Sequence, residues 1–515
     1  MHFFTSERIF KLTVISLLTI IFFYLGFGEQ FFVGPHGIHY MRQTDSLSFA
    51  SQFYNTGYDF FHPALFNLKN GNGNAACEFP ITYYITSLFY GLFGKNFYFL
   101  KLLHLVIVYV GIYLIIHVAK QILKDGVYAI ILGFTLFTST IFNYYSFNYL
   151  PDIAALGFTF IGWYFIHKYY KNQQTKTVIT AFSFFTLGGL LKVTYLINPF
   201  TIIVFTLFQL IRKNKTFQSN FLKKILLTGF VSTFLVFLWN AYMLYYNSKN
   251  NATTFNTKAL PIWDIDQQEI STVIDHITEY WYNSYFYPST FHLLLILCII
   301  SVVFYKKREN NLSILSAILL TGSVAFFILF FSQFKDHDYY FLTFLPLFLL
   351  LLIHGIKTFS NLTHNFFINS IAKIVLIVLV IKGINYAKDG LTNRFQTVKD
   401  IYSEAGLSVR ENEQGLHALH IPEKAKCIIS TDLCPNGALY EINRMGWTVE
   451  DTTDFTTKNI HDYQKLGAEY IVLISTMDTQ LKTADSIGKQ IYQRNNFHVY
   501  KLNQKNKLYK INNLF

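Results

Sequence analysis

The sequence is short of charge. Only 14% of its 515 residues are Asp, Glu, Lys or Arg, whereas 52% are hydrophobic and 19% are aromatic. This composition is typical of a membrane protein and excludes an ordinary globular one. The net charge of +12 does not indicate a nucleic-acid partner, because the basic residues form short clusters between apolar runs.

Several chemical motifs are also missing. The histidines lack the paired spacing of metal ligands, so we expect no metal site and no divalent cation. No glycine-rich phosphate loop follows a strand, which argues against a nucleotide-sugar donor and leaves no cofactor indicated. Segment 9–27 lacks the small-residue cleavage site of a signal peptide, and its length favours a retained first transmembrane helix.

Long apolar runs fill most of the first 390 residues. A membrane-spanning helix needs about 20 predominantly apolar residues, and this criterion predicts about eleven spans. They are 9–27, 99–119, 127–144, 152–168, 177–194, 198–211, 224–246, 289–305, 312–331, 339–356 and 370–387.

The basic clusters predict the orientation. With a cytoplasmic N-terminus, the short inside loops carry Arg8, Lys11, Lys120, Lys124, Lys168, Lys171, Lys176, Arg212, Lys213, Lys215, Lys223, Lys224, Lys306, Lys307, Arg308 and Lys357. The short outside loops, 145–151 and 332–338, carry only Lys335. Because cytoplasmic loops are enriched in Lys and Arg, we expect a multi-pass protein of the bacterial inner membrane.

This orientation places three long segments outside the cytoplasm. They are a first outer loop at 28–98, predicted to carry interfacial helices, a second at 247–288, and the C-terminal region at 391–515. In the last, 427–430 and 470–475 are predicted strands, and 437–445 and 459–466 are predicted helices. We therefore expect a transmembrane domain over 1–390 followed by a small soluble α/β domain outside the cytoplasm.

Ionisable residues near the spans gather at the outer boundary. Asp45 lies in a predicted amphipathic segment, Asp152 begins the fourth span, Lys192 ends the fifth, and His337 with Asp338 precedes the tenth. Such residues are costly near the membrane interior and are functional candidates, although each alone could be a solvated helix end. Glu78 stands before Pro80 and could act in the site or cap a helix.

The order of these motifs resembles a known superfamily. A lone acid in the first outer loop, the string ACEFPITYY with a following Leu-Phe-Gly, Pro-Asp at 151–152, and HDYY before a Leu-Pro resemble the GT-C membrane glycosyltransferases. The similarity covers roughly residues 1–390 and is nearest to the protein mannosyltransferase and aminoarabinose transferase type, including enzymes that modify lipopolysaccharide. Many relatives have Lys-Pro-Pro where this chain has Glu78-Phe79-Pro80.

The resemblance implies roles for individual residues. Asp45 matches the acid that acts as base on the acceptor or orients it. Arg42, Lys192 and His337 are candidates to hold the phosphate of a polyprenyl-phosphate sugar donor. Glu78, Asp152, Tyr339 and Tyr340 complete the candidate binding set.

The chemistry of such a transfer fits these residue types. It needs a carboxylate to take the acceptor proton and positive groups to stabilise the leaving phosphate. Arg42 would share a helical face with Asp45 and could be either such a cation or merely its ion-pair partner.

Other functions and one structural question stay open. The alternatives are an oligosaccharide polymerase or ligase that uses a lipid-pyrophosphate donor, and a transporter or flippase, although the spans lack the mid-bilayer charges of a transporter. Expected partners are the bilayer, a lipid-linked sugar donor, and a glycan, lipid or protein acceptor. Cys427 and Cys434 could form a disulfide outside the cytoplasm, or Cys427 could be an unpaired residue of a buried strand.

Overall fold

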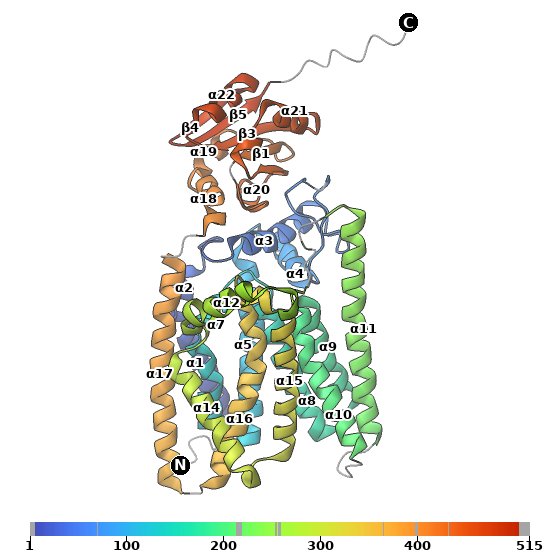
Figure 1. Cartoon of the computed structure of the whole chain (residues 1–515), viewed down its shortest axis with the longest axis vertical. Helices are drawn as coiled ribbons and strands as arrows, with labels where there is room; N and C mark the ends of the chain where they lie inside the picture. Colours follow the sequence, from blue (N-terminus) through green and yellow to red (C-terminus); the bar gives the residue numbers. More distant parts are fainter. Residues whose placement is uncertain are drawn as a thin grey trace.

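A helical bundle carries a small sheet-containing domain at one end (Figure 1). The computed structural model describes residues 6–69, 71–212, 219–252, 255, 259–363, 365–396, 400–430 and 432–503. Of the predicted inside cations, Lys213 and Lys215 lie outside these residues, as does the predicted C-terminal stretch after 503.

Helices form at every segment that was predicted to span the membrane. Their residues are apolar over long runs with few helix-breaking residues inside them. The bundle consists of α1 (Glu7–Tyr24), α5 (Tyr98–Leu123), α6 (Gly126–Thr135), α7 (Thr140–Ser146), α8 (Asp152–Asn172), α9 (Thr175–Leu191), α10 (Ile197–Ile211), α11 (Ser219–Lys249), α14 (Pro288–Val303), α15 (Asn310–Leu329), α16 (Leu345–Leu362) and α17 (Phe366–Gln396).

The predicted number of eleven spans is not confirmed. Among the described residues, six helices are long and apolar enough to cross a membrane, or up to eight if two bent helix pairs each count as one span. Helix α9 has only 17 residues, and α1 begins with the charged residues Glu7, Arg8 and Lys11. The predicted span 127–144 forms a bent helix pair, with a bend of 85° where Ser139 accepts a hydrogen bond from the Phe142 amide and starts α7.

Shorter elements connect the longer helices and strands. The α-helices among them are α2 (Phe27–Gln30), α3 (Tyr40–Asn55), α4 (Ile81–Phe93), α12 (Gln267–Asp275) and α13 (Tyr282–Tyr285). The π-helix η4 (His276–Trp281) joins the last two. Short 3-10 helices are η1 (Leu136–Thr138), η2 (Val193–Leu196), η3 (Ile262–Asp264), η5 (Tyr305–Lys307), η6 (Phe331–Phe334), η7 (Asp338–Phe344), η8 (Ile401–Ser403) and η9 (Thr452–Asp454).

The C-terminal domain is a five-stranded mixed sheet with flanking helices. Its strands are β1 (Lys426–Ser430), β2 (Gly446–Val449), β3 (Ala468–Ile474), β4 (Gly488–Arg494) and β5 (Phe497–Leu502), in the order β2-β1-β3-β5-β4. The first three are parallel and the last two antiparallel. The helices are α18 (Glu404–Glu411), α19 (Glu413–Ala418), α20 (Gly437–Ile442), α21 (Thr457–Lys465) and α22 (Asp478–Ile487).

Two of these strands and two of these helices lie where the sequence predicted them. The predicted helix 437–445 ends early, at Ile442, because Asn443 adopts a left-handed conformation with φ of 53°. Both cysteines of the domain are buried and free, so the disulfide alternative is not observed.

The C-terminal domain is hydrogen-bonded to the first outer loop. The amide of Leu68 donates to Gly446 at 2.7 Å, and the amide of Gly446 donates to Phe66 at 3.0 Å. The same domain places α20 directly over α3 (Figure 1). The prediction that α3 is amphipathic is therefore wrong, because most of its residues, polar ones included, are buried.

Candidate functional site

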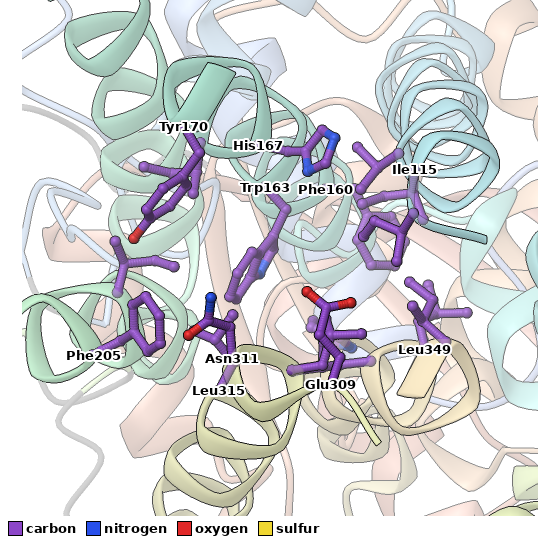
Figure 2. A pocket seen from close by; sticks show the side chains of 18 residues that line it. Ile115, Phe160, Trp163, His167, Tyr170, Phe205, Glu309, Asn311, Leu315 and Leu349 are labelled. Atoms are coloured by element: carbon purple, nitrogen blue, oxygen red, sulfur yellow. The ribbon is translucent and has the colours of Figure 1, made fainter. Parts of the chain in front are cut away.

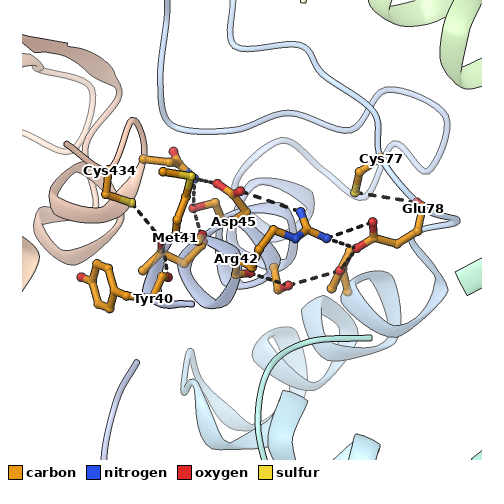
Figure 3. A network of polar contacts seen from close by, with 12 residues as sticks. Tyr40, Met41, Arg42, Asp45, Cys77, Glu78 and Cys434 are labelled. Atoms are coloured by element: carbon orange, nitrogen blue, oxygen red, sulfur yellow. Dashed lines mark hydrogen bonds and ion pairs between the residues drawn. The ribbon is translucent and has the colours of Figure 1, made fainter. Parts of the chain in front are cut away.

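Arg42 on α3 lies between two carboxylates (Figure 3). Its Nη2 donates to both oxygens of Glu78, at 3.0 and 3.1 Å. Its Nη1 lies 3.8 Å from Oδ2 of Asp45, one helical turn along α3. The hydrogen bonds of Arg42 thus go to Glu78, and a quarter of its side chain stays exposed. Arg42 is therefore more than the ion-pair partner of Asp45.

Glu78 is not the helix cap that the sequence allowed. Helix α4 begins at Ile81 after Pro80, and its N-cap makes no side-chain hydrogen bond. Instead the carboxylate accepts from Tyr83, in the first turn of α4. Burial alone would raise the pKa of Glu78. The nearby Arg42 and the hydrogen bond from the Tyr83 hydroxyl lower this pKa by more than burial raises it, so the pKa of Glu78 is below its ordinary value. Glu78 is thus a fixed negative partner for Arg42.

The carboxylate of Asp45 is buried and has few polar partners. Only 3% of the residue is exposed, and the carboxylate accepts a hydrogen bond from Nδ2 of Asn436, at 3.4 Å. Burial raises the pKa of Asp45 to about 6, although Arg42 and Asn436 oppose the shift. Such a group is ionised at neutral pH and is still basic enough to accept a proton.

Asn436 brings the C-terminal domain to this carboxylate. Its amide nitrogen also donates to Oγ of Ser48 at 2.5 Å, and its carbonyl oxygen accepts from the Phe66 amide at 3.0 Å. Asp432 holds the loop before α20 by accepting from the amides of Cys434 and Ala438. Nothing in the sequence pairs Asn436 with Asp45, since 390 residues separate them.

Lys192 and Asp152 form a second charged pair. Nζ of Lys192 lies 3.0 Å from Oδ1 of Asp152, which is 5% exposed, whereas Lys192 is 20% exposed. The ammonium also lies over the rings of Tyr339 and Tyr340, 4.9 and 4.3 Å from their centroids. Four predicted candidates from three separate sequence regions thus meet here.

The two charged groups are neighbours. The amide of Phe79, next to Glu78, donates to the Leu190 carbonyl at 3.0 Å, two residues before Lys192. The charge of Lys192 contributes to the lowered pKa of Glu78. Arg42 and Lys192 are therefore two partly exposed cations at the same end of the bundle.

A third group was only partly predicted. Asp338 is fully buried and bonds Arg394 at 2.7 Å, Tyr145 at 2.5 Å and His39 at 3.2 Å. The ring of His337 stacks between His39 and Tyr340, with centroids 5.9 and 5.5 Å away. Arg394 and His39 were missed, because the pattern of apolar runs carries no information on which helix ends meet.

An apolar cavity elsewhere in the bundle is separate from these groups. It has a volume of about 320 Å³ and lies between α5, α8, α10, α15 and α16, with Trp163, His167 and Glu309 among its lining (Figure 2). None of the eight predicted site residues lines it.

No group of three or more His, Cys, Asp or Glu within the described ranges is placed to hold a metal ion.

Comparison with known proteins gives matches in sequence and in structure. Residues 77–240 match the family model described as dolichyl-phosphate-mannose-protein mannosyltransferase. No curated protein matches the sequence significantly. The structure is similar to apo ArnT from Cupriavidus metallidurans, with 11% identity, a TM-score of 0.57, and coverage of 95% of this chain and 97% of ArnT.

Two ligand-bound structures are similar to a comparable degree. ArnT from the same organism, bound to undecaprenyl phosphate, has 11% identity and a TM-score of 0.56, with 96% of this chain and 98% of that chain covered. The oligosaccharyltransferase AglB from Archaeoglobus fulgidus, in complex with an inhibitory peptide and a dolichol-phosphate, has 11% identity and a TM-score of 0.54, with 97% and 75% covered.

Proposed function

We propose that this chain, which has the fold of the GT-C membrane glycosyltransferases over nearly its whole length, transfers a sugar from a polyprenyl-phosphate donor. The acceptor is a hydroxyl or phosphate at the outer face of the bacterial inner membrane. One observation carries the proposal: a buried carboxylate with a raised pKa, Asp45, lies beside the partly exposed cation Arg42. The undecaprenyl-phosphate and dolichol-phosphate complexes of ArnT and AglB support the donor class.

Asp45 acts as the general base in this proposal. It takes the proton of the acceptor while the acceptor oxygen bonds to the anomeric carbon of the sugar. The bond between that carbon and the phosphate oxygen breaks, and the phosphate leaves with the electron pair. Arg42 and Lys192 stabilise the charge that develops on the phosphate. Glu78 and Asp152 hold these two cations in place, and His337, Tyr339 and Tyr340 complete the donor side.

The pH dependence of transfer tests the role of Asp45. Because the pKa of Asp45 is about 6, the base form is lost as the pH falls through 6. We expect the transfer rate in membranes to drop by about tenfold for each further pH unit. A rate that stays level from pH 7 to pH 5 would contradict the proposal.

Asn436 is predicted to tune this profile. Its hydrogen bond favours the charged form of Asp45, so Asn436→Ala raises the pKa of Asp45 further. We expect the acid limb of the pH–rate profile to move to higher pH, with a larger loss of rate at pH 6 than at pH 8. The control Asn459→Ala, which changes an exposed amide near the start of α21, leaves the profile in place. A uniform loss at all pH values would instead indicate a purely structural role.

The orientation is tested by reporters. The basic inside loops predict that the chain after α17 lies outside the cytoplasm. An alkaline phosphatase fused after Gln396, where α17 ends, is expected to be active, and the same enzyme fused after Arg308, in a predicted inside loop, to be inactive. The reverse pattern would place Asp45 on the cytoplasmic side and contradict the proposed site of action.

A further inference from the structure

A second cavity lies where the C-terminal domain meets the first outer loop. It has a volume of about 710 Å³ and is lined by residues of α18, α19 and α20 on one side and by residues 32–35 and 95–97 on the other. We refer to it as the junction pocket. Its size falls within the range of pockets that bind small organic ligands.

The junction pocket is close to the proposed reaction centre. Helix α20 starts directly after Asn436, which bonds Asp45, and its last residues Tyr440, Glu441 and Ile442 line the pocket. Six helical residues span about 9 Å. Tyr40, which starts α3, also donates to Oε1 of Glu441 at 3.1 Å. The pocket and Asp45 are therefore within reach of one extended ligand.

The lining offers both donors and acceptors. Nζ of Lys95 donates to Oδ1 of Asn443 at 2.6 Å, whereas Arg444 donates to backbone carbonyls. Neither cation has a carboxylate within ion-pair distance in the described part of the chain, and Glu423 lines the same pocket. Arg410 is already neutralised by Glu441. Mixed charged and amide groups of this kind hydrogen-bond to a molecule with many hydroxyls.

The inner wall carries a polar atom without a partner. Tyr90 is 1% exposed and lines the pocket, and its hydroxyl has no hydrogen-bond partner among the described residues. A buried hydroxyl without a partner is costly, and a ligand hydroxyl at this wall would supply the missing bond. Tyr440 and Phe97 add aromatic surfaces beside it.

We propose that the junction pocket binds a saccharide portion of the acceptor, so that the acceptor is a glycan or glycolipid and not a bare protein chain. The sugar rings pack against Tyr440 and Phe97, their hydroxyls bond Tyr90, Lys95, Asn443 and Arg444, and the acceptor nucleophile reaches Asp45. This inference rests on the proposed function for the identity of the ligand as acceptor, but saccharide binding at the pocket is independent of catalysis.

The test uses the full-length protein in detergent without donor. Fluorescently labelled protein is applied to an array of bacterial oligosaccharides and to an array of Ser- and Thr-containing peptides, and the strongest oligosaccharide is then titrated by calorimetry. We expect binding to oligosaccharides only. Binding to none of the oligosaccharides, or to peptides alone, overturns the proposal.

Variants then locate the binding. Tyr90→Phe and Lys95→Gln are each expected to weaken the dissociation constant about 3- to 10-fold, because each removes one ligand hydrogen bond. Tyr90→Phe should not lower the melting temperature, since its hydroxyl bonds no described residue. The matched controls Tyr463→Phe and Lys458→Gln, on α21 outside the pocket, should bind like wild type.

The outcomes separate this inference from the proposed function. Unchanged affinity in both pocket variants overturns the saccharide site. Asp45→Asn should still bind the oligosaccharide, because Asp45 does not line the pocket. If that variant also transfers sugar normally, the proposed role of Asp45 fails while saccharide binding at the junction pocket stands.

Discussion

Replacing Asp45 with Asn should reduce sugar transfer by a factor of about 10² to 10⁴, which is the usual contribution of a general base. The amide keeps the size of the carboxylate and its place beside Arg42 and Asn436, but it cannot accept the acceptor proton. The measurement is transfer of labelled sugar from a polyprenyl-phosphate donor in membranes that contain equal amounts of wild-type or variant protein.

A nearby carboxylate provides the control. Asp59 also lies in the first outer loop, but it is exposed and pairs with His62 at 2.8 Å. Asp59→Asn should therefore transfer at the wild-type rate. Activity of Asp45→Asn within about twofold of wild type would remove Asp45 from the chemistry.

Replacing Arg394 with Met should destabilise the protein by about 3–5 kcal/mol, because it leaves the buried carboxylate of Asp338 without its cation. The pair joins the end of α17 to the start of η7, and only 5% of Arg394 and none of Asp338 is exposed. Thermal unfolding of the detergent-solubilised protein measures the effect.

A second substitution should restore much of this loss. In D338N/R394M the buried charge is gone, while the amide oxygen still accepts from Tyr145 and His39, which bond the carboxylate in the wild type. We expect the double variant to be more stable than R394M. Lys465→Met, which breaks an exposed pair with Asp462, should cost less than about 1 kcal/mol. A double variant as unstable as the sum of both single changes would contradict this view of the pair.

The sequence predicted the bundle well because its signal is local. Long apolar runs such as 99–119 and 370–387 predict helices without reference to other parts of the chain, and helices α5 and α17 form at these positions. The cost of placing ionisable residues near the membrane interior also predicted Asp152, Lys192 and His337 as functional candidates from the sequence. Asp152 and Lys192 form an ion pair because each lies at the end of its own helix, and His337 stacks on Tyr340, which lies under Lys192.

The remaining parts depend on contacts between distant segments. The bend at Ser139, the burial of α3 and the bond from Asn436 to Asp45 all arise where separate elements pack, and no local pattern encodes them. The role of Glu78 is similar: its place before Pro80 resembles a cap, yet Arg42 and Tyr83, 36 and 5 residues away, determine its partners.

A donor-release assay identifies the donor and the part that Asp45 plays in its turnover. Purified protein is incubated with acceptor-containing membranes from a deletion strain and, in parallel, with polyprenyl-phosphate sugar, polyprenyl-pyrophosphate oligosaccharide or nucleotide sugar, and the released carrier is measured. We expect release of polyprenyl phosphate from the first donor alone, dependent on the membranes and lost in Asp45→Asn. Turnover of the pyrophosphate or nucleotide donor instead, or equal release by Asp45→Asn, would contradict the proposed function.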